Sequence, residues 1–148
     1  RPGPHARIGE TTRGGRMTRK VLIADDEERI RSLVVATLGS DERYEVLTAA
    51  DGADAVSICQ AERPEVLFLD LLMPKMDGYA VCRELKGSPA TRDIKIVMLT
   101  AMVQESDRRT AMKLGVDDFV TKPFSPLALA AKLEEMLDPG RMSVARAA

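Results

Sequence analysis

The alternation of short apolar runs with helical patterns is the feature that most constrains how this chain can fold. The apolar runs have the length of strands and are bounded by polar or turn residues. They lie at residues 20–24, 44–49, 65–70, 94–100 and 116–121. Each run is followed by a segment with apolar residues at helical spacing. This order predicts five strand–helix units and an α/β fold.

The helical segments have recognisable ends and inward faces. Asp51 and Ser125 are expected N-caps, and Pro126 suits the first position of the last helix. Gly39 and Gly115 are expected to close the first and fourth helices. The residues expected to face the core are Ile30, Leu33, Val34, Thr37 and Leu38 in the first helix, Ala55, Val56 and Cys59 in the second, Val81, Cys82 and Leu85 in the third, and a thinner stripe of Thr110, Ala111 and Leu114 in the fourth.

Unbroken apolar strands are typical of a parallel sheet that is covered on both faces. Right-handed crossovers then place helices on both sides of that sheet. With 148 residues, 45% of them hydrophobic, the chain is expected to form one domain with one core. The core is expected to be aliphatic, because Trp is absent and aromatic residues make up 3% of the chain. Cys59 and Cys82 lie on apolar stripes without CxxC spacing, so buried reduced thiols are expected.

Polar side chains stand where these strands end. Asp25 and Asp26 end the first strand, Asp70 the third and Thr100 the fourth, and Lys122 follows the fifth. The carboxyl ends of parallel strands lie at one edge of the sheet, and ligands bind there at the switch point in strand order. We therefore expect these five side chains to gather at one edge.

This group of residues predicts metal-assisted phosphoryl chemistry. Three converging carboxylates repel one another unless a cation joins them. The only histidine, His5, lies in the leader, so the site is all oxygen, which suits Mg²⁺, or alternatively Mn²⁺, better than Zn²⁺. A carboxylate can also attack a phosphoryl group and form an acyl phosphate. A metal ion and a lysine would neutralise the charge on the transferring oxygens.

Four segments carry a resemblance to a known family. They are "LIADDEERIR", "FLDLLMPKMDGYAVCREL", "PATRDIKIVMLTA" and "GVDDFVTKPFSP". With the spacing between them they cover residues 19–137. The chain resembles the receiver domain of response regulators in two-component signalling, in its chemotaxis-regulator-like form. The resemblance implies a flavodoxin-like (βα)5 fold with a doubly wound, parallel, five-stranded sheet in the strand order 2-1-3-4-5.

The resemblance also implies a role for each residue of the expected site. Asp70 matches the phosphoacceptor, Asp26 the direct Mg²⁺ ligand, and Asp25 the acid that binds the metal through water. Leu72, two residues after Asp70, matches the position whose backbone carbonyl contributes to the metal site. Lys122 matches the lysine that pairs with the phosphoryl group.

Further positions match the phosphate pocket and the switch of the family. Thr100 matches the hydroxyl that follows the phosphoryl group, and Phe119 occupies the aromatic switch position. Ala101 matches the small residue that leaves room for the phosphate. The Lys122–Pro123 peptide bond matches a bond that is cis in the family.

The implied partner upstream is a sensor histidine kinase or a phosphotransfer protein. The response is expected on the face built from residues 104–115, 116–121 and 125–137, which would contact a downstream protein or a second copy of the chain. Lys132 stands where regulators that dimerise through this face often carry Arg, which weakens the expectation of a dimer.

The lifetime of the phosphorylated form is a separate expectation. Leu72 and Met102 lie two residues past Asp70 and Thr100, beside the expected route of the attacking water. Both side chains are apolar and cannot orient that water. Slow self-dephosphorylation is therefore predicted.

Several alternatives stay open at this point. Asp25 and Asp26 would also serve as caps of the first helix, where acids favour the helix dipole. The chain is either a stand-alone regulator, a fragment of a larger regulator with an output domain, or an interaction module that no longer takes phosphate. No turnover of an external substrate is expected, since a phosphohydrolase with an aspartyl nucleophile needs a second Asp where Leu72 stands.

The domain boundaries complete the expectations. Residues 1–18 are expected to form a disordered leader, residues 19–138 the receiver domain, and residues 139–148 a C-terminal tail. The leader is basic but rich in Gly and Pro, and the tail is too short for a helix-turn-helix, so direct nucleic-acid binding is not expected. The apolar runs are too short to cross a membrane and no signal peptide is recognisable, which favours a cytoplasmic location.

Overall fold

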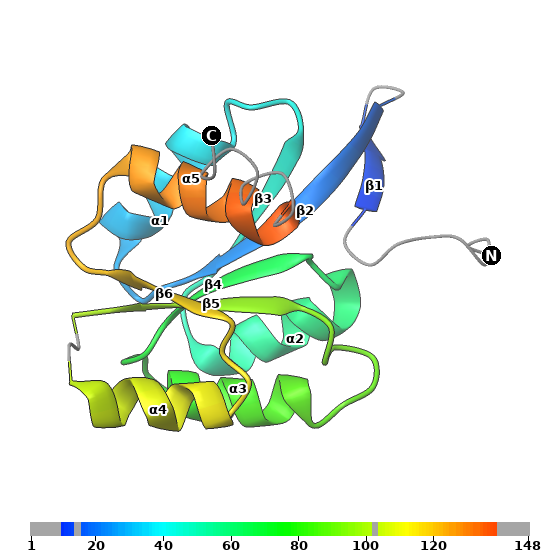
Figure 1. Ribbon diagram of the computed structural model, residues 1–148. Helices are drawn as coiled ribbons and strands as arrows, with labels where there is room; N and C mark the ends of the chain where they lie inside the picture. Colours follow the sequence, from blue (N-terminus) through cyan, green and yellow to red (C-terminus); the bar gives the residue numbers. More distant parts are fainter. Residues whose placement is uncertain (1–9, 14–15, 102–103, 139–148) are drawn as a thin grey trace.

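The computed structural model describes residues 10–13, 16–101 and 104–138. In these residues, one sheet is sandwiched between two layers of helices (Figure 1). The strands are β1 (Glu10–Arg13), β2 (Arg16–Ala24), β3 (Tyr44–Ala49), β4 (Val66–Asp70), β5 (Lys95–Thr100) and β6 (Asp118–Thr121). The helices are α1 (Glu28–Leu38), α2 (Gly52–Glu62), α3 (Gly78–Lys86), α4 (Glu105–Lys113) and α5 (Pro126–Leu137).

The parallel part of the sheet has the predicted topology. Its strands lie in the order β3-β2-β4-β5-β6, and all four pairings between them are parallel. Counted from the first parallel strand, this is the order 2-1-3-4-5. The chain order reverses between β3 and β4 around β2, which places the switch point at the carboxyl ends of β2 and β4.

Helices cover the sheet on both faces, as the unbroken apolar strands predict. Figure 1 shows α1 and α5 on one face and α2, α3 and α4 on the other. Each face has its own apolar cluster, one around Leu67 and Leu69 and the other around Val66 and Phe68. These four consecutive residues of β4 are completely buried, so β4 is held from both sides. Burial of this kind is the main stabilising contribution to such a fold.

The predicted caps and thiols are confirmed. The side chain of Asp51 accepts a hydrogen bond from the backbone N–H of Asp54 at 2.8 Å, and that of Ser125 accepts one from Ala128 at 3.0 Å. Cys59 and Cys82 are free and buried, and burial raises the pKa of each thiol to about 12.

The expected leader is the main point where the structure differs from the sequence analysis. Glu10–Arg13 forms β1 and pairs antiparallel with Arg16–Arg19, the first part of β2. The expectation of disorder is therefore wrong for residues 10–13 and 16–18. Threonines, which favour strands, recur in these segments, and pairing with β1 supplies backbone partners to the end of β2 that β4 does not reach. Residues 1–9 of the expected leader and the expected tail at 139–148 lie outside the described residues.

Two predicted inward-facing residues also lie elsewhere. Leu33 is 37% exposed on α1, and Thr110 is exposed on α4, where its hydroxyl donates to the carbonyl of Ser106 at 3.0 Å. Residues at helical spacing cover a wider face of a helix than the stripe that is buried against the sheet, so residues at the margin of that face stay exposed. None of the helices in the described ranges is both long and apolar enough to cross a membrane.

Candidate functional site

The carboxyl ends of the parallel strands bring the predicted polar residues to one edge of the sheet. Asp25 follows β2 directly, Asp70 ends β4, Thr100 ends β5, and Lys122 comes one residue after β6. The register aligns these ends, because Asp70 is paired with Leu99 and Thr100 with Thr121. Residues up to 97 positions apart thus meet, as the hydrogen bond between Asp25 and Lys122 shows.

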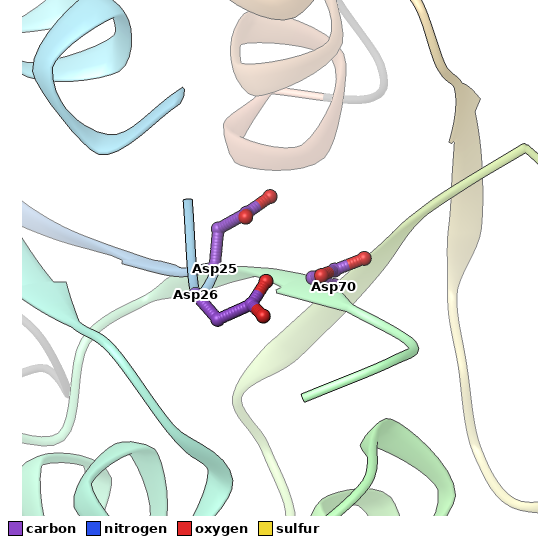
Figure 2. A group of neighbouring side chains, drawn as sticks. All are labelled: Asp25, Asp26 and Asp70. Carbon is purple, nitrogen blue, oxygen red and sulfur yellow. The ribbon is translucent and has the colours of Figure 1, made fainter. Parts of the chain in front are cut away.

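Three carboxylates form a cluster at this edge. Asp25, Asp26 and Asp70 each offer one oxygen, and these oxygens lie within 4.8 Å of one another. Figure 2 shows the three side chains grouped at the ends of β2 and β4. Asp25 is fully buried and Asp70 is 7% exposed, whereas Asp26 is open to solvent. The cluster therefore has two fixed acids and one accessible acid.

Asp25 is held by hydrogen bonds from both sides. Its Oδ1 accepts from the backbone N–H of Glu27 at 2.9 Å, and its Oδ2 accepts from Nζ of Lys122 at 2.8 Å. The guanidinium of Arg31 donates to the backbone carbonyl of Asp25 at 2.8 Å. A buried carboxylate needs such partners to remain charged.

Lys122 joins the acids. Its Nζ lies 2.8 Å from Oδ2 of Asp25 and 3.3 Å from Oδ1 of Asp70. Burial lowers the pKa of Lys122, but the hydrogen bond to Asp25 and the charges of Asp25 and Asp70 outweigh this effect, and the net pKa is raised. Lys122 is therefore a firmly charged ammonium group beside Asp70.

Asp70 has a perturbed acidity. Burial raises its pKa from the ordinary 3.8 to about 6, the nearby charge of Asp25 adds to the rise, and Lys122 opposes it. Burial disfavours the charged form of the carboxyl, and the neighbouring negative charge disfavours it further. Perturbed carboxyls in such positions are typical of functional sites.

The residues present fit a hard divalent cation. Asp25, Asp26 and Asp70 supply only oxygen atoms, which suits Mg²⁺ better than the softer transition metals. Asp26 is exposed and leaves a path to the cluster. A bound cation would also offset the charge that raises the pKa of Asp70.

The rest of the predicted site lies around this cluster. Thr100 is 7% exposed, and its backbone carbonyl accepts from the N–H of Lys122 at 2.9 Å. The Lys122–Pro123 peptide bond is cis, as the resemblance implies. Ala101 lines a surface pocket together with Lys122, Pro123 and residues of α1. Leu72 is 77% exposed in the loop after β4. Met102 lies outside the described residues.

Phe119 lies farther from the acids, on β6. Its ring is half-buried against the core, and the guanidinium of Arg108 on α4 lies 4.8 Å from the ring centroid. The sequence analysis singled out neither Arg108 nor Arg31, because both contacts depend on how the helices pack against the strands. Arg31 donates to a backbone carbonyl, which any residue offers, and Arg108 lies on a different element from Phe119, so neither contact has a local signal in the sequence.

Comparison with known proteins identifies the class. The family model described as "Response regulator receiver domain" matches residues 21–134, and the chain belongs to this family. It is therefore a receiver domain of a response regulator in two-component signalling. Receiver domains are in general non-enzymatic signalling modules that interact with histidine kinases.

Individual relatives are consistent with this class. A "Probable transcriptional regulator ycf27" from Cyanophora paradoxa is 48% identical over 119 residues, which are 80% of this chain and 48% of that protein. The chain thus spans about half the length of this relative. The chemotaxis protein CheY4 of Vibrio cholerae superposes with a TM-score of 0.76 at 32% identity, covering 80% of this chain and 98% of the other.

A further solved structure bears on the metal. The receiver domain of the sensor histidine kinase PA1611 from Pseudomonas aeruginosa has a TM-score of 0.72 at 28% identity and covers 80% of this chain and 97% of its own. It is described as having a magnesium ion coordinated in its active-site cleft.

Proposed function

We propose that Asp70 accepts a phosphoryl group from a phosphohistidine donor, supplied by a sensor histidine kinase or a phosphotransfer protein. A carboxylate oxygen of Asp70 attacks the phosphorus atom and forms an O–P bond. The P–N bond of the donor breaks, and its electron pair stays on the imidazole nitrogen. The product is an acyl phosphate.

The observation that carries this proposal is the position of Lys122 between two acids. Its ammonium lies 3.3 Å from Asp70, close enough to pair with phosphoryl oxygens attached to that carboxylate. It also lies 2.8 Å from Asp25, which holds it in place. A bound Mg²⁺ would neutralise charge on the transferring oxygens. Asp25, Asp26, Asp70 and the backbone carbonyl of Leu72 would hold it, with Thr100 and Ala101 left to accommodate the phosphoryl oxygens.

Intact-mass spectrometry after incubation with Mg²⁺ and acetyl phosphate tests this proposal. Wild type should gain a phosphoryl adduct, and Asp70→Asn should not. Asp93→Asn is the matched control, because Asp93 is an exposed carboxylate just before the amino end of β5, at the opposite edge of the sheet from the acids. The absence of an adduct on wild type, or its persistence in Asp70→Asn, would overturn the assignment.

We further propose that phosphorylation changes the face formed by α4, β6 and α5. Among the described residues of α4 only Ala111 is buried, so this helix is weakly anchored and its local opening free energy is expected to be low. Phe119 is half-buried at the edge of that face. The added phosphate carries a charge of about −1.5 to −2. It would draw in Thr100 and Lys122 and let Phe119 turn inward, which shifts the balance between two states of the face.

Hydrogen exchange with and without beryllofluoride and Mg²⁺ tests this second step. Exchange rates should change in α4, β6 and α5 as well as in the loops of the site. Changes confined to those loops would refute the proposed response.

The partner downstream of this face follows from the relatives. We infer that the receiver controls an output function such as transcription, because a 48% identical relative is named a probable transcriptional regulator and is about twice as long as the matched region. The face carries its own ion pairs, with Lys132 Nζ 2.6 Å from Asp118 and 3.0 Å from Glu135. Light scattering with and without beryllofluoride tests for a second copy of the chain at this face: a doubled mass on activation indicates a dimer, and an unchanged mass favours a different downstream partner.

A further inference from the structure

The loop between β4 and α3 carries part of the proposed metal site, and its two ends are tied down. It covers residues 71–77 and includes Leu72. The N–H of Leu71 donates to the carbonyl of Leu99 at 3.3 Å, and the N–H of Gly78 donates to the carbonyl of Leu71 at 2.8 Å. Gly78 permits this close return, since a Cβ there would lie 2.9 Å from Cα of Leu71. These bonds fix where the loop leaves β4 and where it enters α3.

The last part of the loop, before α3, rests on the first residue of α2. A Cβ added to Gly52 would overlap the carbonyl oxygen of Met76 and lie 2.7 Å from the Met76 Cβ. Most of this contact is with backbone, which cannot turn away as a flexible side chain can. Gly52 is buried, and its missing side chain lets the loop backbone pack directly against the start of α2.

An ion pair joins the same two elements. Oδ2 of Asp51, the N-cap of α2, lies 3.3 Å from Nζ of Lys75 in the loop. Lys75 has φ +70°, the left-handed region that glycine and asparagine adopt more readily than lysine. Lys75 thus has a backbone conformation that is unfavourable for its residue type, and its side chain pairs with the N-cap of the helix that supports the loop.

We propose that Asp51 and Gly52 are positioning residues for the metal site. They form a platform that fixes the distance between the loop and the start of α2. That distance sets the position of the Leu72 carbonyl relative to Asp25, Asp26 and Asp70. The platform contacts neither the metal nor the phosphoryl group itself. This inference rests on the proposed function, because it assigns a role toward the cation that the acids would hold.

Titration calorimetry with Mg²⁺ on the unphosphorylated chain tests the platform. Gly52→Ala should weaken Mg²⁺ binding by about 10-fold, since outer-shell partners of metal ligands typically contribute about 10–100-fold to affinity. Gly39→Ala is the matched control, because its Cβ would overlap the carbonyl oxygen of Val35 at the end of α1 remote from the acids. This control should lower thermal stability and leave Mg²⁺ affinity unchanged.

A second set of variants addresses the ion pair without adding volume. Asp51→Asn keeps an N-capping side chain but loses the charge that faces Lys75, and Lys75→Met removes the partner. Each should weaken Mg²⁺ binding by about 2-fold, in line with an exposed ion pair, and the double variant should weaken it no further. These variants decide the question even if Gly52→Ala does not fold.

The possible results distinguish a failure of the proposed metal site from a failure of the platform. Wild type that binds no Mg²⁺ overturns the proposed metal site and the platform with it. Wild type that binds Mg²⁺ while Gly52→Ala, or both single variants of the ion pair, bind it equally well overturns the platform alone. Equal losses in Gly39→Ala and Gly52→Ala would also overturn it, since the effect would then be one of general stability.

Discussion

Replacing Asp70 by Asn is expected to stabilise the metal-free protein at neutral pH. Asp70 is 7% exposed, and burial followed by the charge of Asp25 raises its pKa from 3.8 to about 6. A raised pKa means that the folded state holds the proton more tightly than the unfolded state. The folded protein at pH 7 must therefore carry a charge that its surroundings disfavour. Asparagine has nearly the same shape and no charge.

The size and sign of the effect follow from the two pKa values. Each pH unit of difference corresponds to about 1.4 kcal/mol, so a folded pKa of about 6 against 3.8 gives at most about 3 kcal/mol. Below the unfolded pKa both states are protonated, and Asp70 imposes no penalty. As pH rises from about 4 to about 6 the unfolded state loses its proton first, and the wild type loses stability relative to the variant. Above about pH 6 the difference reaches its plateau.

Urea denaturation at a series of pH values measures this difference. The free energy of unfolding of Asp70→Asn minus that of wild type should be small near pH 4 and grow to about 2–3 kcal/mol near pH 7. Asp93→Asn, which changes an exposed carboxylate, should stay within about 0.5 kcal/mol of wild type throughout. Saturating Mg²⁺ should reduce the advantage of the variant, because the wild type gains the binding energy of a ligand that the variant holds less well.

The reasoning is refuted if Asp70→Asn is no more stable than wild type at pH 7. It is also refuted if the variant is more stable by the same amount at pH 4 and pH 7, because a gain independent of pH would arise from packing and not from charge.

Three further predictions concern individual residues of the site and the last helix. Lys122→Met leaves the buried Asp25 without its cation partner and should destabilise the protein by about 3 kcal/mol at neutral pH, as measured by urea denaturation; an unchanged midpoint would contradict the role of this pair. Leu72→Asn places a polar group two residues after Asp70 and should speed the decay of the acyl phosphate severalfold in a mass-spectrometric time course, whereas an unchanged rate would show that an apolar Leu72 is not what slows hydrolysis. Ser125→Ala removes the hydrogen bond to the N–H of Ala128 and should lower stability by about 1 kcal/mol, with Ser125→Asp as the variant that retains the cap.

Local patterns in the sequence predict the fold well because the central strands are short, continuous runs of apolar residues. Residues 21–24 and 66–69 are apolar without interruption, and strands of this kind are buried on both faces regardless of which helices cover them. Their order along the chain, combined with right-handed crossovers, leaves few topologies. The same reasoning places Asp25, Asp70 and Lys122 at one edge before any distance is known.

The structure differs from the prediction where contacts between elements determine whether a residue is buried or a strand forms. Leu33 has the spacing of a core residue, yet at 37% exposure it lies at the margin of the stripe that α1 buries. The strand at Glu10–Arg13 exists through its pairing with Arg16–Arg19, and neither segment alone has the apolar alternation that would indicate a strand. The contact of Arg108 with Phe119 likewise depends on the distance between α4 and β6, which no local pattern encodes.

The burial of β4 links the fold to the acidity of the site. Four completely buried residues lead into Asp70, so the carboxylate has a fixed position and little access to water. The same burial raises its pKa to about 6, and Asp25, itself fully buried, adds to the rise. One lysine lies beside three acids, so negative charge is in excess at the site. A site with this imbalance is destabilised when empty and is relieved by added positive charge. Its rigidity and its expected affinity for a cation therefore have a common origin in the way the sheet buries its central strand.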